Sequence, residues 1–166
     1  MSHQKPAVSI VGLGVIGASA GLCLRKAGAA SQVIGHDKSA EASSQAKKTG
    51  AVDRTEWNLI SACEKADIVL LALPFAAVRE TLQAISPHLR PGSVVLDVST
   101  AKAPVLEWAD ELLPPEAHFV GLDPILANPT PALGESGTGK EGAPPQMGTL
   151  QPRADLFQGG LMVTGG

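Results

Sequence analysis

The sequence contains no tyrosine, three phenylalanines and two tryptophans, so aromatic side chains can fill little of a hydrophobic core. The core must then be built from alanine, valine, leucine and isoleucine, which suits a parallel β-sheet covered by helices. The formal net charge is −3, and this balance gives no indication of a nucleic-acid partner. No apolar run approaches the ~20 residues that cross a bilayer, so we expect no membrane association.

Cysteine is also scarce. Cys23 and Cys63 lie far apart, in apolar or helical surroundings and without metal-ligand spacing, so we expect two buried free thiols and no metal site. The first six residues lead directly into an apolar run, and no signal-peptide core precedes that run. We therefore expect one domain over residues 1–166, located in the cytoplasm.

The most informative segment is the run Val8-Ser9-Ile10-Val11-Gly12-Leu13-Gly14-Val15-Ile16-Gly17. It combines an apolar strand, a Gly-x-Gly-x-x-Gly turn and the start of an Ala/Leu-rich helix. In this pattern Gly12 permits the tight turn, Gly14 lets the backbone approach a pyrophosphate, and Gly17 lets the helix pack close to the sheet. The N–H groups at the helix N-terminus can then bind the phosphates. The alternative is a tight turn without a ligand.

An acidic residue completes this motif. Asp37 follows a second apolar run and lies 20 residues past Gly17, and the spacing typical of dinucleotide-binding proteins is about 20 residues. Its carboxylate would accept hydrogen bonds from the adenosine ribose hydroxyls and repel a 2′-phosphate, which favours NAD over NADP. Lys38 is a nearby positive charge that leaves NADP open, or it is a solvated side chain. His36 either lies against the adenine or is a surface residue.

The expected cofactor-binding residues come from this turn, from the acid and its neighbour, and from two later strand ends. They are Gly12, Leu13, Gly14, Val15, Ile16, Gly17, Asp37, Lys38, Leu73, Pro74 and Ser99.

Runs typical of strands alternate with runs typical of helices along most of the chain. The predicted strands are Ala7–Val11, Gln32–Gly35, Val52–Thr55, Ile68–Leu73, Ser93–Val98, His118–Leu122 and Leu161–Thr164. The predicted helices are Ile16–Ala27, Ser39–Thr49, Leu59–Lys65, Phe75–Ile85 and Pro104–Leu113. This alternation predicts an α/β fold of Rossmann type, a doubly wound and mostly parallel sheet with helices on both faces.

The regular pattern stops after the sixth predicted strand. Residues 123–152 are rich in proline and glycine and show no apolar periodicity. A loop of this length in a compact domain is usually functional or disordered. We expect a loop over about residues 128–152, with a mobile middle.

Three polar residues follow predicted strands at the end of the sheet where doubly wound folds bind ligands. Thr100 and Lys102 come after Ser93–Val98, and Asp123 comes after His118–Leu122. A functional interpretation gives Thr100 a hydrogen bond to substrate or nicotinamide, Lys102 a substrate carboxylate, and Asp123 a role in proton transfer. The alternatives are helix capping by Ser99 or Thr100, a solvated lysine, and an Asp-Pro turn.

Several segments together resemble the prephenate/arogenate dehydrogenases of tyrosine biosynthesis. They are Ile10–Ser19, Gly50-Ala51-Val52-Asp53, Ala66–Pro74, Leu96–Lys102, Phe119-Val120-Gly121 and Asp155-Leu156-Phe157. The resemblance covers nearly the whole chain as that family's N-terminal nucleotide-binding domain. It implies an NAD-dependent oxidoreductase in which nicotinamide accepts a hydride, carbon dioxide leaves and the substrate ring becomes aromatic.

Two departures accompany the resemblance. The family carries a histidine that holds the substrate hydroxyl, and Asp123 occupies that position here. Aspartate is the weaker base and would need burial to act near neutral pH. The resemblance covers none of the family's helical C-terminal domain, which completes the pocket and dimerises, so we expect a missing helical domain or a homodimer mate as partner. The catalytic candidates are Asp123, Thr100 and Lys102, acting on a small-molecule substrate.

Two other functions stay open. The sequence Asp97-Val98-Ser99-Thr100 followed by Pro104 also resembles the strand end of 3-hydroxyacid dehydrogenases. A third interpretation is a non-catalytic dinucleotide-binding module, which the replaced histidine favours.

Overall fold

The computed structural model describes residues 4–124, residue 152 and residues 161–163. The strands are β1 (Ala7–Val11), β2 (Gln32–His36), β3 (Arg54–Thr55), β4 (Ile68–Leu71), β5 (Val94–Asp97), β6 (His118–Pro124) and β7 (Leu161–Val163). The helices are α1 (Val15–Ala27), α2 (Ala40–Lys48), α3 (Leu59–Cys63), α4 (Phe75–Ile85) and α5 (Lys102–Leu112), with a 3₁₀ turn η1 (Ser86–His88).

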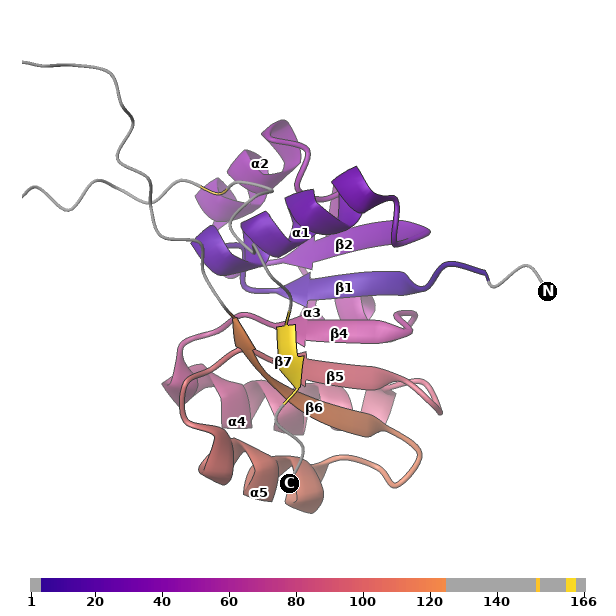
Figure 1. Ribbon diagram of the computed structural model, residues 1–166, viewed down its shortest axis with the longest axis vertical. Coiled ribbons are helices and arrows are strands. Elements are labelled where there is room, and N and C mark those ends of the chain that lie inside the picture. Colours follow the sequence, from indigo (N-terminus) through magenta and orange to yellow (C-terminus); the bar gives the residue numbers. More distant parts are fainter. Residues whose placement is uncertain (1–3, 125–151, 153–160, 164–166) are drawn as a thin grey trace, which may run out of the picture.

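The strands form one sheet of order β3-β2-β1-β4-β5-β6-β7 (Figure 1). The pairs from β3 to β6 are parallel, and β7 joins β6 in the antiparallel sense. The chain winds outward from β1 to β3, then crosses over and winds outward again from β4. The winding direction therefore reverses between β1 and β4, and doubly wound folds bind ligands outside the strand ends at this position.

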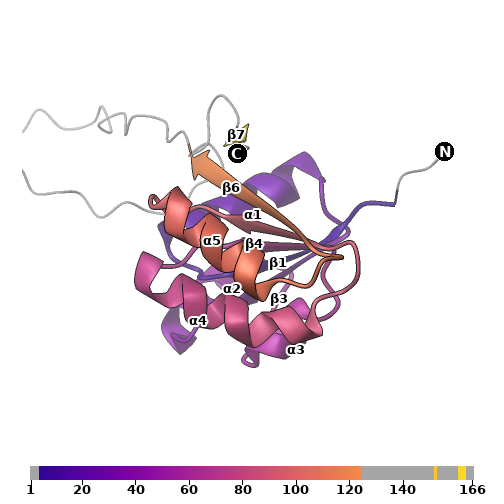
Figure 2. The ribbon, with the colours of Figure 1, turned by 90° about the horizontal axis from the view of Figure 1, so that it is seen from below.

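Helices cover both faces of the sheet. Figure 2 shows α1 on one face and α3, α4 and α5 on the other. Aliphatic residues of β4 and β5 pack beneath α4 and α5, with Val69, Val78, Leu82, Val95 and Val105 all fully buried. A second apolar cluster lies under α1. The predicted Rossmann-type fold is confirmed, because near-continuous aliphatic strands bury both faces of a parallel sheet.

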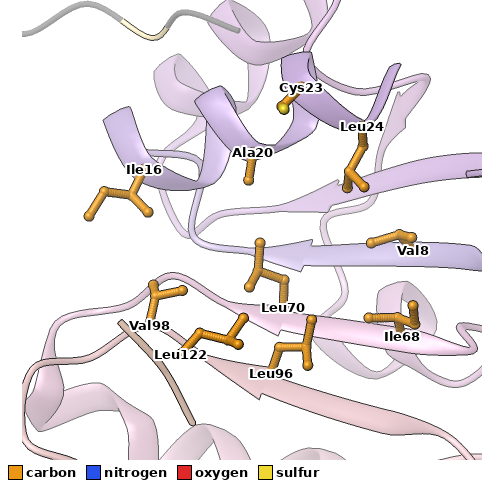
Figure 3. A pocket seen from close by; sticks show the side chains of 10 residues that line it. All are labelled: Val8, Ile16, Ala20, Cys23, Leu24, Ile68, Leu70, Leu96, Val98 and Leu122. Atoms are coloured by element: carbon orange, nitrogen blue, oxygen red, sulfur yellow. The ribbon is translucent and has the colours of Figure 1, made fainter. Parts of the chain in front are cut away.

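One part of the α1 face is hollow. Side chains of α1 stand opposite side chains of β1, β4, β5 and β6 around an apolar groove of about 170 Å³ (Figure 3). Its lining consists of Val8, Ile16, Ala20, Cys23, Leu24, Ile68, Leu70, Leu96, Val98 and Leu122. The groove offers no charged side chain, so it differs in chemistry from the cleft at the strand ends that is described below.

Most predicted elements are confirmed, and the differences lie at their ends. β4 stops at Leu71, because the next residues lead into α4 with Pro74 as its N-cap. β6 continues to Pro124, so Asp123 lies in a strand and not in a turn, because it pairs with Met162 of β7. Ser39 caps α2 as predicted, accepting a hydrogen bond from the N–H of Ala42 at 3.2 Å.

The predicted loop over about residues 128–152 lies outside the described residues, apart from residue 152. Within the part of the chain that the structure describes, no helix is both long and apolar enough to cross a membrane.

Both cysteines are free thiols, as predicted. Cys63 is buried, whereas Cys23 is only partly buried, because its side chain lines the apolar groove. Burial raises the pKa of the Cys63 thiol from its ordinary 9.0 to about 11, against a smaller opposing effect of its contact with Ser9.

Candidate functional site

The turn from β1 into α1 has the geometry that its glycines predict. Gly12 adopts φ +95°, where side chains are strained, and a Cβ atom there would lie 2.3 Å from the carbonyl oxygen of Ala72. A Cβ atom on Gly17 would lie 1.9 Å from the carbonyl oxygen of Gly12. A Cβ atom on Gly14 would meet nothing within 4 Å. The first and third glycines are therefore required by the fold, and the second leaves open space at the start of the helix.

The N-terminus of α1 presents free donors beside this space. Gly14 is the N-cap residue in an extended conformation, and no side chain caps the helix or places an acid in its first turn. The first intrahelical bond runs from the N–H of Ala18 to the carbonyl oxygen of Gly14 at 2.9 Å. Because the N–H groups before Ala18 have no helical acceptor, an anion can bind here.

Asp37 joins the glycine turn to the end of β2. One carboxylate oxygen accepts the N–H of Leu13 at 2.7 Å, and the other accepts the N–H of Ser39 at 2.7 Å. The N–H of Gly12 also donates to the carbonyl oxygen of His36 at 2.9 Å. The acid is thus fixed beside the turn, and a carboxylate oxygen has lone pairs left for a further donor.

These groups surround a cleft of about 410 Å³ at the carboxyl ends of β1, β2 and β4. Its lining residues are Val11, Gly12, Gly14, His36, Asp37, Lys38, Leu59, Ala72, Leu73, Pro74, Ala77 and Thr81. The cleft combines apolar walls with a few polar groups, which is the usual composition of a small-molecule site.

The predicted cofactor residues divide into three groups. Gly12, Gly14, Asp37, Lys38, Leu73 and Pro74 line the cleft, whereas Leu13, Val15, Ile16 and Gly17 stand in or behind the turn. The Leu13 side chain is buried and its N–H donates to Asp37, so Leu13 would act on a ligand only by holding that carboxylate. The Ile16 side chain lines the apolar groove, so Ile16 would serve a ligand through its N–H group alone. Ser99 lies on β5's side of the sheet and does not line the cleft.

Sequence reasoning missed the cleft residues that come from α3 and α4, which are Leu59, Ala77 and Thr81. No local signal marks them, because the tertiary fold alone brings those helices to the strand ends. The surface position considered for His36 is wrong. This histidine is 7% exposed, because its ring packs beneath the cleft with Nδ1 3.0 Å from the carbonyl oxygen of Glu56.

A second polar cluster lies at the carboxyl end of β5. Asp97 is fully buried, and one carboxylate oxygen accepts both the hydroxyl of Ser99 at 2.5 Å and its N–H at 3.1 Å. The other oxygen of Asp97 has no hydrogen-bond partner among the described residues. Ser99 therefore does not cap α5, whose N-cap is Ala101 with no side-chain hydrogen bond. The capping alternative is wrong for Thr100 as well.

Lys102 links this cluster to β6. Its ammonium group donates to the carbonyl oxygens of Ser99 and Leu122, the second at 2.6 Å, and lies 3.4 Å from a carboxylate oxygen of Asp123. The Lys102 side chain is 17% exposed, so the solvated alternative is wrong. The Asp123 side chain is 50% exposed, so the burial that would make it a stronger base is not present. Thr100, two residues before Lys102 in the chain, is exposed.

A doubly wound sheet, a glycine turn with a free helix N-terminus and an acid at the end of β2 together define a nucleotide-binding domain of Rossmann type. The sequence profile of the family "Prephenate dehydrogenase, nucleotide-binding domain" matches residues 20–136. This chain belongs to that family.

Known proteins of the same family resemble the chain in sequence and in fold. A prephenate dehydrogenase of Bacillus subtilis is 32% identical over 132 residues, which cover 77% of this chain and 35% of that protein. The crystal structure of an A. aeolicus prephenate dehydrogenase in complex with hydroxyphenyl propionate and NAD+ superposes with a TM-score of 0.77 at 25% identity, covering 100% of this chain and 52% of the other. A Synechocystis arogenate dehydrogenase gives 0.66 at 30% identity, covering 74% and 42%.

The chain spans about a third of the length of curated relatives that it matches, since it covers 35% of the Bacillus subtilis protein and 34% of a prephenate dehydrogenase of Lactococcus lactis. Groups that those relatives supply from their remaining residues are therefore not part of this cleft.

Proposed function

We propose that this chain is the cofactor-binding part of an NAD-dependent dehydrogenase that acts on prephenate or arogenate. The observation that carries the proposal is the placement of Asp37 beside the glycine turn in a cleft at the strand-order reversal. Family membership supports it. NAD is bound in the A. aeolicus structure of the family.

The residues present fit a dinucleotide. The open space at Gly14 and the free N–H groups of α1 suit a pyrophosphate, because a Cβ atom at Gly14 meets nothing and no acid competes in the first turn. The carboxylate of Asp37 suits the ribose hydroxyls. The apolar walls at Leu59 and Leu73 suit a flat base. When bound, nicotinamide supplies the hydride acceptor for the oxidation.

Asp37 also supports NAD over NADP, since a carboxylate repels a 2′-phosphate. Lys38 lines the same cleft and is the observation that keeps NADP as the second candidate. We expect Asp37→Ser to weaken NAD binding by about tenfold and to raise the affinity for NADP relative to NAD. Calorimetric titration with both cofactors measures this. An unchanged preference in Asp37→Ser would contradict the assigned role of the carboxylate.

For the reaction itself we propose an oxidative decarboxylation in which the chain orients the substrate and takes up the hydroxyl proton. Asp123 is the candidate proton acceptor, and the Lys102 ammonium group lies 3.4 Å from its carboxylate. Thr100 is exposed, and we propose that its hydroxyl bonds to the substrate or to nicotinamide. We further propose one domain over residues 1–166, working in the cytoplasm with a helical partner domain or a second copy that completes the substrate pocket.

The test is the growth of the reduced-nicotinamide absorbance with purified chain, NAD and prephenate, beside a sample of Asp123→Asn. Growth that is lost in the variant supports the assignment of Asp123. Growth with small 3-hydroxyacids instead of prephenate supports the alternative enzyme class.

NAD binding without any turnover supports a non-catalytic module or a need for the residues that the longer relatives carry. The contacts of Lys102 with the Ser99 carbonyl and the Asp123 carboxylate favour the non-catalytic module, because a lysine that binds these groups is not free for a substrate.

A further inference from the structure

We propose that His36 reads the adenine base of the bound dinucleotide, with its Nε2 atom accepting a hydrogen bond from the exocyclic amino group. The cleft would then distinguish adenine from bases that carry a carbonyl oxygen at that position, such as hypoxanthine. This inference rests on the proposed function, because it assumes that the cleft holds a dinucleotide.

His36 is placed for this task by the end of β2. It is the last residue of that strand and comes directly before Asp37, which is assigned to the adjacent ribose. Both residues line the same cleft. The base attached to that ribose would therefore meet the part of the cleft beside Asp37, where the His36 ring is found.

The backbone of Glu56 fixes the state of the ring. Nδ1 of His36 lies 3.0 Å from the carbonyl oxygen of Glu56. A carbonyl oxygen only accepts, so Nδ1 must carry the hydrogen, and in the neutral ring Nε2 is then left with a lone pair. The carbonyl itself is held in place, because the N–H of Glu56 donates to the carbonyl oxygen of Gly35 at 2.9 Å. The fold thus selects the tautomer with an acceptor at Nε2.

That acceptor has no partner of its own. Among the described residues no hydrogen bond reaches Nε2 of His36, and this atom is not one of the fully buried unpartnered side-chain atoms. The hydroxyl of Thr81, which also lines the cleft, is already used, since it donates to the carbonyl oxygen of Ala77 at 2.8 Å. Leu59 and Leu73 contribute only apolar surface. Nε2 is therefore the ring's remaining polar atom for a ligand in this part of the cleft.

The two bases present opposite chemistry to such an acceptor. Adenine carries an amino group that donates, whereas hypoxanthine carries a carbonyl oxygen whose lone pairs would face the lone pair of Nε2. A site built to bond one group rejects an analogue that leaves its partner unpaired, because the unpaired group loses water without compensation. We expect NAD to bind at least tenfold more tightly than its hypoxanthine analogue.

Calorimetric titration of the full chain with NAD and with nicotinamide hypoxanthine dinucleotide tests this. Three proteins are compared, namely the wild type, His36→Phe and His88→Phe. The phenylalanine at position 36 keeps an aromatic ring but removes both nitrogens, and His88 is an exposed histidine of η1 away from the cleft. We expect the wild type and His88→Phe to prefer NAD, and His36→Phe to bind the two dinucleotides equally.

Equal affinities in the wild type would overturn the inference, and so would a preference that survives in His36→Phe. The comparison of the two dinucleotides on the wild type decides the matter even if His36→Phe does not fold. Binding of neither dinucleotide would instead refute the proposed function, and the inference with it. The two failures are therefore distinct.

Discussion

The polar groups at the carboxyl ends of the strands are bonded differently in the two halves of the sheet. At the carboxyl ends of β1 and β2, backbone N–H groups and the Asp37 carboxylate surround a cleft and keep bonding capacity for a ligand. At the carboxyl ends of β5 and β6, Asp97, Ser99, Lys102 and Asp123 bond to one another or to strand carbonyls. The first arrangement is ready for a ligand, whereas the second would have to exchange internal partners before Lys102 could bind one.

The largest expected effects come from alanine substitutions at two glycines of the turn between β1 and α1, and they differ in kind. Gly12→Ala places a Cβ atom at 2.3 Å from a backbone oxygen with φ +95°, and we expect it to lower the free energy of unfolding by roughly 3–5 kcal/mol. Gly14→Ala meets nothing within 4 Å, so we expect an unchanged melting temperature and NAD affinity reduced roughly 100-fold. Thermal denaturation and calorimetric titration measure the two effects.

The matched pair contains its own control, since both changes add one methyl group to the same turn. A Gly12→Ala protein that melts like the wild type would show that the turn is not constrained as described. A Gly14→Ala protein that binds NAD normally would remove the pyrophosphate from the start of α1.

An intermediate effect is expected in the second half. Lys102→Met keeps the apolar stem but removes the ammonium group, which leaves the carbonyl oxygens of Ser99 and Leu122 without that donor. We expect the free energy of unfolding to fall by about 2–3 kcal/mol, because a buried acceptor loses a charged partner. Urea denaturation measures this change.

Lys65→Met is the control for that experiment, because Lys65 is exposed and its side chain forms no ion pair or hydrogen bond within the described residues. Equal stability of the two variants would show that Lys102 does not hold β5 and β6 together. Lys102 would then be available to a substrate, and the polar groups at the ends of β5 and β6 would no longer differ from those at the ends of β1 and β2.

The smallest effect tests whether the core beneath β1 excludes water from the buried Cys63 thiol. The Cys63 sulfur lies 3.8 Å from the Ser9 hydroxyl of β1, and its pKa is raised by burial from 9.0 to about 11. Folding favours the neutral thiol, so this contribution is complete below pH 9 and is lost as the pH rises towards 11. Between pH 8 and 10 we expect a loss of about 1 kcal/mol.

Urea denaturation at the two pH values measures this loss. Cys63→Ala reports the pH dependence of all other titratable groups, so the wild type should lose about 1 kcal/mol more than this variant. The same slope in both proteins would mean that the thiol is solvated and that the core under β1 is more open than the structure indicates.

Local sequence predicted most of the fold. Strands were recognisable as aliphatic runs, and the glycine turn with Asp37 was recognisable by spacing, because these features depend on residues that are close in the chain. The position of Asp123 in β6 was not predicted, since the extra pairing comes from Met162. A strand partner that is far away in sequence leaves no mark on the residues it orders.

The candidate site shows the same limit. The contact of Lys102 with the Leu122 carbonyl joins residues 20 positions apart through backbone atoms, which no residue pattern encodes. The orientation of the buried His36 ring likewise depends on the carbonyl oxygen of Glu56, 20 positions away. The bond between Asp97 and Ser99 is different, because an acid two residues before a serine at a strand end is a local signal that could have indicated it.

The attachment of the glycine turn to Asp37 has a kinetic consequence. Because the Asp37 carboxylate holds the N–H groups of Leu13 and Ser39 through bonds within the chain itself, the conformational entropy of ordering this turn is lost during folding and not during ligand capture. Binding of the dinucleotide then needs no slow rearrangement of the glycine turn. We expect the association rate constant to depend on diffusion and charge more than on loop motion. The turn is therefore a preorganised binding site for the pyrophosphate.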